Sequence, residues 1–423
     1  MKIYRHLWEK IITFENFKLA YKNATKGKKH YKEVKLIERK GVNSYLRKLL
    51  EEVKSKQYKV SHYDIFTLFT GEKVREIYRL PMKDRIVQHA LMNIIEPLFR
   101  ETFIKDTYSS IKGRGIHPAL KRVKRVVKSG RYTYYLKVDI RKCYPSIDKE
   151  ILKSKLSRKF RDNDLLWLLF TIIDSCDKGL PIGNYTSQYF NNFYFSDLDH
   201  YFKEHLRVKG YFRYCDDIVI FAESKEELHK LLKILQRKIA ELNVNLKDNY
   251  QIYNIEVRSV DFLGYKTRCN YTLIRKHIKR RFIKKVSKMN FNNLSIKDIN
   301  TLGSYWGIFV HANCRNLWYK YTGVKTFKDL NVSVHKRDFV RDILGVELTI
   351  TNSNVFTKRG QEWLRFECSY IKNNDKDEPV IYDSVYISTS AEKLVEAGKQ
   401  FNPSMYPFKT TINLDDKGFY EFN

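Results

Sequence analysis

Residues 211–224, YFRYCDDIVIFAES, place two adjacent aspartates between two runs of buried-type residues. The pattern predicts a β-hairpin with Asp216 and Asp217 at its tight turn. Two carboxylates beside buried strands repel each other and lose hydration unless a cation compensates them. A solvated hairpin tip is the common outcome for such a pair, so the rest of the chain has to decide between the two interpretations.

The charge of the chain favours a cationic environment. Its 423 residues carry a formal net charge of +32. Residues 324–423 hold 14 basic and 15 acidic residues, so residues 1–323 hold 66 and 33. An excess of this size is not needed for folding, and a polyanionic partner such as a nucleic acid is its usual reason. A generally basic surface without a specific partner is the alternative.

Other classes of protein are less consistent with the composition. No apolar run reaches the length of a membrane span, and the first residues lack the apolar core of a signal peptide, so we expect a cytoplasmic protein without a membrane partner. The six cysteines are scattered without a CxxC pair, which favours reduced thiols over a zinc site or a disulfide framework.

Hydrophobic periodicity indicates several domains. Residues 1–60 predict helices with a basic face, and a strand-like segment ending at Pro81 precedes an amphipathic helix after Asp84. Ser224 is the expected N-cap of a helix that follows the hairpin. Short strands with a single helix follow from about residue 340, so the switch in charge and period places a boundary near residues 324–340.

A third acidic residue supports a metal site. In the segment YTYYLKVDIRKCYPSID, a strand ends at Asp139 and is followed by a turn and a helix. With Asp216 and Asp217 on a neighbouring strand, it would form an oxygen-ligand site of the kind that Mg²⁺ prefers. Two Mg²⁺ ions held there could activate a 3′-hydroxyl and stabilise a leaving pyrophosphate.

These residues together resemble the palm of a reverse transcriptase: Asp139 in VDIRKCYPSID lies 77 positions before Asp216 in YCDD. Other segments resemble the remaining motifs in their family order, namely REIYRLPMKDRIVQHAL, YSSIKGRGIHPAL, GLPIGNYTSQ, LNVNLKDNYQIY, VDFLGYK and LGSYWGIFVHANC. The resemblance implies an α+β right-hand polymerase with four parts: a basic helical extension (1–70), fingers and palm (71–270), thumb helices (271–335) and a β-rich domain (336–423).

The segment LPIGNYTSQ narrows the resemblance. Retron and group II intron enzymes usually have Gln before this glycine and SP at the end, whereas this chain has Ile182 and Ser187–Gln188. That pattern resembles unknown-group reverse transcriptases, several of which act in bacterial antiphage defence, and those of diversity-generating retroelements. The first branch implies copying of a structured noncoding RNA into cDNA; the second, error-prone copying, remains the alternative. An RNA-binding scaffold without catalysis and a nuclease are further alternatives, and an oligomer is possible but not indicated.

The resemblance also assigns roles in the palm. Asp139 and Asp216 would ligate both Mg²⁺ ions, the carbonyl of Ile140 is a possible extra ligand, and Asp217 would complete the cluster. Tyr144 would be a steric gate that excludes a ribose 2′-hydroxyl and so favours dNTPs. A packing role is the alternative for this tyrosine.

Further residues are expected to contact nucleotide or nucleic acid. The cations expected near the triphosphate are Lys83, Arg85 and Arg114. Gly183 and Gln188 would lie beneath the templating pair, and Lys247 could protonate the leaving pyrophosphate. The basic helix in IRKHIKRRFIKKVSKM would hold the backbone of an RNA–DNA hybrid through Arg275, Lys276, Lys279, Arg280 and Lys284. A position that faces solvent or RNA backbone is the alternative for each of the three triphosphate cations, and an ordinary surface position is the alternative for Lys247.

The C-terminal strands suggest a small β-barrel, possibly OB-like, that would hold a single strand by stacking on aromatic residues. The aromatic residues expected to be exposed are Trp363, Phe366, Tyr370, Tyr382 and Tyr386. Because this part of the chain is nearly neutral, a packing or oligomerisation module is an equal alternative.

Overall fold

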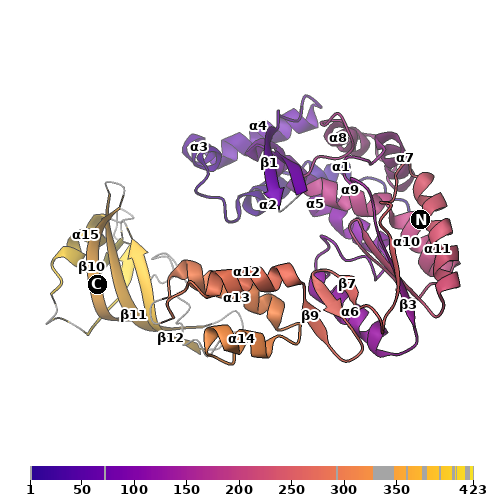
Figure 1. Ribbon diagram of the computed structural model, residues 1–423. Coiled ribbons are helices and arrows are strands. Elements are labelled where there is room, and N and C mark those ends of the chain that lie inside the picture. Colours follow the sequence, from indigo (N-terminus) through magenta and orange to yellow (C-terminus); the bar gives the residue numbers. More distant parts are fainter. Residues whose placement is uncertain are drawn as a thin grey trace. The chain divides into compact units, whose positions relative to one another are not determined.

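The chain was analysed as a computed structural model (Figure 1). The structure describes residues 2–70, 73–291, 294–326, 347–358, 361–373, 379–389, 392–402, 405, 407–414 and 420–422. The chain divides into two compact units. The first comprises Met1–Arg281 and Ile308–Cys314, and the second comprises Phe282–Gly307 and Arg315–Asn423. Within the described residues, no helix combines the length and apolar character that a membrane crossing requires.

The first unit begins with four short helices that pack into its core. They are α1 (Trp8–Ile11), α2 (Phe14–Thr25), α3 (Lys32–Lys40) and α4 (Val42–Lys54). Their apolar residues join one buried cluster with the long helix α5 (Met82–Thr102). The Asn16 amide donates to the carbonyl of Ala90 on α5 at 2.9 Å, and Glu33 accepts from the amide of Met82 at 2.5 Å. The predicted basic helices are therefore part of the same compact unit as the sheet described next.

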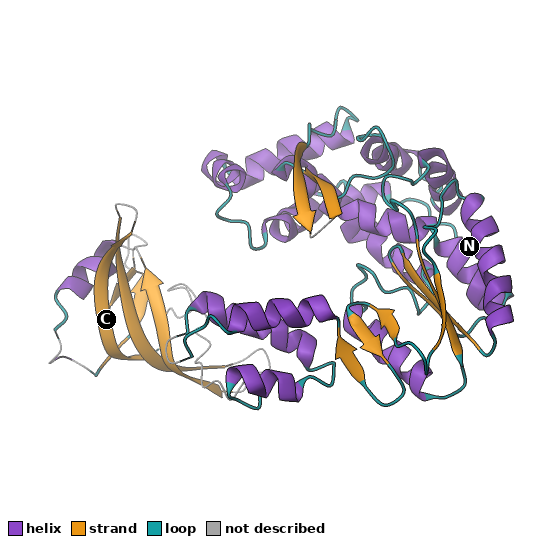
Figure 2. Cartoon of the chain, viewed as in Figure 1, coloured by secondary structure: helices purple, strands orange, loops and turns teal. Residues whose placement is uncertain are grey.

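The central sheet has four strands in the order β4-β5-β3-β6. They are β3 (Tyr134–Asp139), β4 (Tyr211–Tyr214), β5 (Asp217–Ala222) and β6 (Gln251–Asn254). All three pairings are antiparallel, which confirms the predicted hairpin. Figure 2 shows these strands beside helices of the same unit.

Side chains alternate between the two faces of this sheet. Leu136 and Ile220 belong to a buried cluster with α11 (Lys225–Ala240), whereas Tyr135 and Val219 pack with α6 (Ile116–Lys128). Further helices complete the first cluster: α7 (Lys149–Lys159), α8 (Asn163–Ile173), α9 (Tyr185–Tyr194), α10 (Ser196–His200) and the π-helix η1 (Tyr201–His205). The hydroxyl of Ser224 accepts from the Glu227 amide at 3.1 Å, so the predicted N-cap of α11 is confirmed.

Two smaller sheets complete the first unit. The hairpin of β1 (Asp64–Thr70) and β2 (Lys73–Arg79) precedes α5. A three-stranded sheet contains β7 (Val260–Phe262), β8 (Tyr265–Thr267) and β9 (Thr272–Ile274). The segment VDFLGYK, expected to be one strand, is a tight hairpin instead, because Leu263 and Gly264 both have positive φ, at 56° and 89°. Two consecutive residues of this kind turn the chain back on itself.

The basic helix α12 (Lys276–Val286) begins in the first unit and ends in the second. The second unit also contains α14 (Arg315–Thr322) and all of α13 (Ile296–Phe309) except its last two residues. In the second unit, Phe282 stacks on the buried Trp318 with ring centres 5.9 Å apart. The predicted boundary at residues 324–340 lies largely outside the described residues.

The C-terminal part contains the predicted strands. A four-stranded antiparallel sheet has the order β12-β11-β10-β13, formed by β10 (Leu348–Lys358), β11 (Gln361–Asn373), β12 (Pro379–Thr389) and β13 (Phe408–Thr410). A second ladder pairs β14 (Ile412–Leu414) with β15 (Tyr420–Phe422), and α15 is Glu392–Lys399. Among the described residues, the larger sheet has β12 and β13 as its edges. The side chains of the five aromatic residues expected to be exposed lie outside those that the structure describes.

Candidate active site

The central sheet brings Asp139 and Asp217 to adjacent positions. Asp139 is the last residue of β3 and Asp217 is the first of β5, and the two are direct cross-strand partners. Because both positions point to the same face of the sheet, carboxylates 78 residues apart in the chain lie side by side. The register of a single strand pair thus brings together two of the three carboxylates that the sequence predicts as neighbours. With Asp216 they form the acidic edge of the sheet.

Asp216 occupies the turn next to this pair. Tyr214 and Asp217 close the hairpin, so Cys215 and Asp216 are its two turn residues. Cys215 has a φ of 57°, an uncommon conformation for a residue with a side chain. The carbonyl of Asp216 accepts from the Ile140 amide at 2.9 Å, so the turn is joined to the residue that follows Asp139.

Two lysines face the carboxylates. Lys137 lies two residues before Asp139 on the same face of β3, and its Nζ is 3.7 Å from Oδ2 of Asp217. Lys247 Nζ is 3.5 Å from Oδ1 of Asp139, and its backbone amide donates to the Asp139 carbonyl at 2.8 Å. The structure therefore brings Lys247 next to Asp139, and its transfer of a proton to pyrophosphate stays a prediction.

Burial raises the pKa of Asp217 to about 7, from an ordinary value of 3.8. The Lys137 ammonium lowers this pKa, but the neighbouring Asp139 and Asp216 carboxylates raise it further. The Oδ1 atom of Asp217 is buried without a hydrogen-bond partner. A buried oxygen of this kind beside two other carboxylates is an environment that a bound cation would stabilise.

The donor set at this edge fits Mg²⁺, which prefers carboxylate and carbonyl oxygens together with substrate phosphates. The candidate donors are the three aspartates and the carbonyl of Ile140. Among the described residues, no three or more acidic, histidine or cysteine side chains lie together in an arrangement that could by itself hold a metal ion. The fit rests on the donor chemistry and on the unpaired Oδ1 of Asp217.

Tyr144 lies beside the hairpin turn. Its hydroxyl is 3.7 Å from Sγ of Cys215, and burial raises its pKa well above the ordinary value. Gly179 permits a close approach to the backbone of this residue, because a Cβ at Gly179 would lie 2.3 Å from the Tyr144 carbonyl oxygen. The residue predicted to be the gate thus lies next to the turn that carries Asp216, and its role as a gate stays a prediction.

The three cations expected at the triphosphate have protein partners. Lys83 Nζ is 2.7 Å from the Glu52 carboxylate. Arg85 Nε donates to the Leu80 carbonyl at 2.9 Å. Arg114 Nη1 donates to the carbonyls of Ile104 and Thr107 at 2.5 and 3.1 Å.

Arg114 thereby holds the loop that runs beside β4, where Thr107 forms a parallel bridge with Arg213. Sequence reasoning missed this supporting role, since no pattern marks a guanidinium that binds backbone carbonyls several residues upstream. The triphosphate contacts of all three cations remain predictions.

Gly183 and Gln188 lie at the start of α9 and are both exposed. The carbonyl of Ile182 accepts from the Tyr78 amide of β2 at 2.8 Å. A Cβ at Gly183 would lie 2.2 Å from the Tyr78 carbonyl oxygen. The glycine therefore permits a close backbone approach between this loop and the β1–β2 hairpin, and its nucleotide contact stays a prediction.

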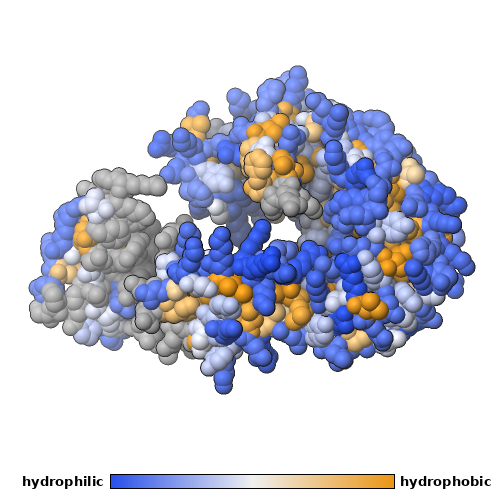
Figure 3. Space-filling view, viewed as in Figure 1, coloured by the Kyte–Doolittle hydropathy of each residue, from blue (hydrophilic) through white to orange (hydrophobic). Residues whose placement is uncertain are grey.

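The cations of α12 differ in exposure. Lys276, Lys279, Arg280 and Lys284 are exposed, and Figure 3 shows hydrophilic side chains along this helix. Arg275 precedes the helix and is half-buried, with its Nε 2.5 Å from Oδ1 of Asp261. The four exposed cations can contact a phosphate backbone directly, whereas Arg275 would first have to leave its carboxylate.

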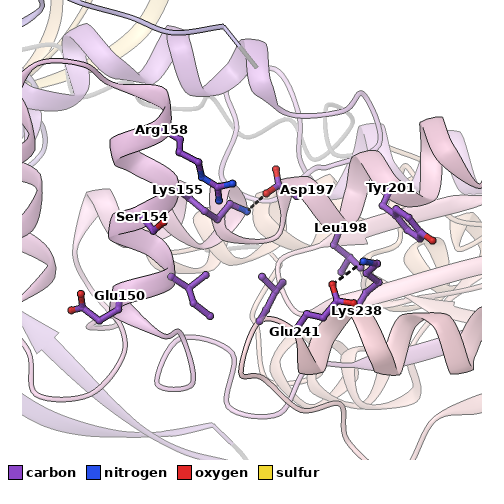
Figure 4. A pocket seen from close by; sticks show the side chains of 11 residues that line it. Glu150, Ser154, Lys155, Arg158, Asp197, Leu198, Tyr201, Lys238 and Glu241 are labelled. Carbon is purple, nitrogen blue, oxygen red and sulfur yellow. Dashed lines mark hydrogen bonds and ion pairs between the residues drawn. The ribbon is translucent and has the colours of Figure 1, made fainter.

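Two hollows open on the first unit. One, of about 530 Å³, has Lys247 in its wall and extends to Arg141 and Asp248. The other, of about 590 Å³, lies between α7, α10, η1 and α11 (Figure 4). Its two lysines are paired with carboxylates of the same wall: Lys155 with Asp197 at 3.0 Å and Lys238 with Glu241 at 2.8 Å. None of the three aspartates lines this second hollow.

Comparisons with known proteins agree with the geometry. Residues 70–267 match the family model described as reverse transcriptase (RNA-dependent DNA polymerase). The Retron Ec73 reverse transcriptase of Escherichia coli is 27% identical over 195 residues, covering 43% of this chain and 60% of that protein. The group II intron-encoded protein LtrA of Lactococcus lactis subsp. cremoris is 24% identical over 182 residues, covering 41% of this chain and 29% of that protein.

The chain thus spans about three fifths of the retron relative and less than a third of the intron relative. Apo telomerase from Candida tropicalis has a TM-score of 0.44 at 12% identity, covering 69% of this chain and 62% of that chain. Residues 70–267 thus match a reverse transcriptase family model, and this part of the chain is similar to retron and group II intron reverse transcriptases.

Proposed function

We propose that this protein is an RNA-directed DNA polymerase that uses Mg²⁺ at the edge formed by Asp139, Asp216 and Asp217. The observation that carries the proposal is the cross-strand pairing of Asp139 with Asp217, beside a turn that presents Asp216. It lies inside the segment that matches the reverse transcriptase family model. The excess of basic residues over residues 1–323 suits a nucleic-acid substrate.

Each side chain has a defined task in this proposal. Bound Mg²⁺ would lower the pKa of the primer 3′-hydroxyl and neutralise charge on the leaving pyrophosphate. Asp139 and Asp216 would hold the metal, with the Ile140 carbonyl as a possible further ligand, and Asp217 would complete the acidic edge. Lys247, whose Nζ is 3.5 Å from Oδ1 of Asp139, would give a proton to the pyrophosphate. Tyr144 would exclude the ribose 2′-hydroxyl.

The test is primer extension by the full chain on an RNA template with dNTPs and Mg²⁺. The double variant Asp216→Ala with Asp217→Ala should lower the rate by about 10³-fold or more, since metal-assisted charge stabilisation is worth several kcal/mol. Glu223→Ala is the matched control, because this exposed carboxylate directly follows β5 and pairs with Arg131 at 3.5 Å. Equal activity of both variants would contradict the proposal and favour the RNA-binding scaffold.

We further propose that the template is a structured noncoding RNA and that the cDNA serves antiphage defence in the bacterial cytoplasm. The support is the resemblance of LPIGNYTSQ to unknown-group enzymes. Sequencing of nucleic acid that co-purifies with the protein tests it: one structured RNA with its cDNA supports defence. A template paired with a variable repeat in the neighbouring DNA would instead favour a diversity-generating element. A single-strand-binding role for the OB-like C-terminal domain belongs to the same proposal, and a truncation after residue 323 tests it by RNA retention.

A further inference from the structure

Behind the catalytic turn lies an ion pair from which solvent is fully excluded. Arg213 on β4 and Asp199 on α10 both have 0% exposed side chains. Arg213 Nε donates to Oδ1 of Asp199 at 2.7 Å, and Nη2 donates to Oδ2 at 2.6 Å. This two-pronged contact sets the plane of the guanidinium as well as its position.

The Asp199 carboxylate is itself held by two hydroxyl groups. Tyr211, on the same strand as Arg213, donates to Oδ1 at 2.7 Å, and Thr107 donates to Oδ2 at 2.8 Å. Both donors are completely buried. Because each carboxylate oxygen has two donors, Asp199 has little freedom to rotate and fixes Arg213 in turn.

The far side of the guanidinium reaches the catalytic turn. Nη1 of Arg213 donates to the carbonyl of Cys215 at 3.1 Å and to Oδ1 of Asn192 at 3.2 Å, and Nη2 donates to the Asn192 carbonyl at 3.3 Å. With the two bonds to Asp199, these contacts use all five N–H donors of the guanidinium. The carbonyl of Cys215 belongs to the peptide that links this residue to Asp216.

That peptide is the point where the backbone needs support. Cys215 has a φ of 57°, which disfavours a residue that carries a Cβ. A hydrogen bond to its carbonyl from a fixed guanidinium opposes rotation of the turn into a more relaxed conformation. The orientation of the Asp216 backbone therefore depends on a side chain that does not itself reach the reaction.

We propose that Arg213, held by Asp199, is a positioning residue that keeps the Cys215–Asp216 peptide, and so the Asp216 carboxylate, in its metal-binding orientation. The inference rests on the proposed function, because it concerns the same acidic edge. Stability alone does not explain the ion pair: replacing a buried pair by apolar side chains is often neutral or stabilising. A planar guanidinium group, with N–H donors on more than one side, is needed to bind the Asp199 carboxylate and the Cys215 carbonyl at the same time.

The first test measures the turn without metal or substrate. Hydrogen–deuterium exchange of residues 212–219 in the full chain should be roughly fivefold faster in Arg213→Lys, because one ammonium cannot hold Asp199 and also reach Cys215. Tyr211→Phe is the matched control. It removes a bond to the same carboxylate from the same strand, but none to the turn. The two bonds from Arg213 and the one from Thr107 still hold Asp199, so exchange at residues 212–219 should stay near the wild-type rate.

The second test measures metal dependence. In Arg213→Lys the Mg²⁺ concentration at half-maximal primer extension should rise severalfold, whereas Tyr211→Phe should keep the wild-type value. Adding Cys215→Gly to Arg213→Lys should restore part of the loss, because glycine adopts positive φ without support. A role in packing alone predicts no such rescue.

The outcomes separate the two proposals. An inactive wild-type protein overturns the proposed function, whereas the exchange measurement still tests Arg213. An active wild type with equal exchange and equal Mg²⁺ dependence in Arg213→Lys and Tyr211→Phe overturns the positioning role. If Arg213→Lys does not fold, the same exchange measurement is made on Asp199→Asn. This substitution keeps the side-chain volume and Arg213 itself but weakens the two hydrogen bonds between residues 199 and 213. Exchange at the turn no faster than in Tyr211→Phe would then refute the inference.

Discussion

Replacement of Gly183 by alanine should detach the loop before α9 from the β1–β2 hairpin. Gly183 has a φ of 135°, a region that residues with a Cβ rarely adopt. An added Cβ would lie 2.2 Å from the carbonyl oxygen of Tyr78 and 3.2 Å from its carbonyl carbon. Both neighbours are backbone atoms of β2, so no side-chain rotation relieves the clash.

Two contributions set the size of the effect. Backbone strain at such a φ costs about 1–3 kcal/mol. Separation of the two segments also breaks the 2.8 Å hydrogen bond from the Tyr78 amide to the Ile182 carbonyl, which is worth about 1 kcal/mol. We therefore expect Gly183→Ala to lower the free energy of local opening by roughly 2–4 kcal/mol.

The assay is hydrogen–deuterium exchange at residues 73–79, together with urea unfolding of the full chain. Gly113→Ala is the matched control, because Gly113 has a φ of 77° but open space where its Cβ would lie. It should show the cost of positive φ alone, about 1 kcal/mol, without faster exchange in β2. Equal effects of the two substitutions would refute the steric argument.

Three other substitutions test individual side chains. Burial lowers the pKa of Lys159 to about 8 from 10.5. Between these two pH values the unfolded chain binds more protons than the folded chain, so the free energy of unfolding rises with pH. Lys159→Met should stabilise the protein by roughly 2 kcal/mol below pH 8, and the gain in urea midpoint should vanish above about pH 10.5. Burial, together with the nearby cations Lys28 and Arg85, lowers the pKa of His89 to about 4 from 6.5. The free energy of unfolding should therefore fall as the pH falls from 6.5 to 4, and it should fall less in His89→Phe. Identical acid unfolding of the wild type and His89→Phe would contradict this. Tyr144→Val should raise the ratio of ribonucleotide to deoxyribonucleotide incorporation by about 10-fold or more, measured by single-nucleotide extension, and an unchanged ratio would leave Tyr144 as a packing residue.

Much of the candidate site follows from local sequence signals. Strands with turn residues between them predicted the hairpin that carries Asp216 and Asp217, and the structure confirms it. The end of the strand at Asp139 was equally visible, because a polar residue follows a run of buried-type residues. The N-cap at Ser224 depended only on residues three positions apart.

Other features could not be predicted in this way. Lys137 lies 3.7 Å from Asp217 only because the register of β3 and β5 makes them diagonal neighbours on one face. The partnership of Asp199 with Arg213 joins a helix to a strand, and neither residue carries a motif that announces it. VDFLGYK contains two strands, since its turn uses a leucine at positive φ, which composition does not favour.

The sequence by itself determined the chemistry available to this protein: the acidic triplet, the surplus of cations and the order of the motifs that resemble a polymerase. These properties follow from which residues are present and from spacings of a few positions. Only the tertiary structure decided which oxygen is buried without a partner, which glycine admits a neighbouring strand and which arginine supports the turn. The physical reason is that burial, strand register and hydrogen bonding between distant segments arise when the chain closes on itself, and no local pattern encodes them.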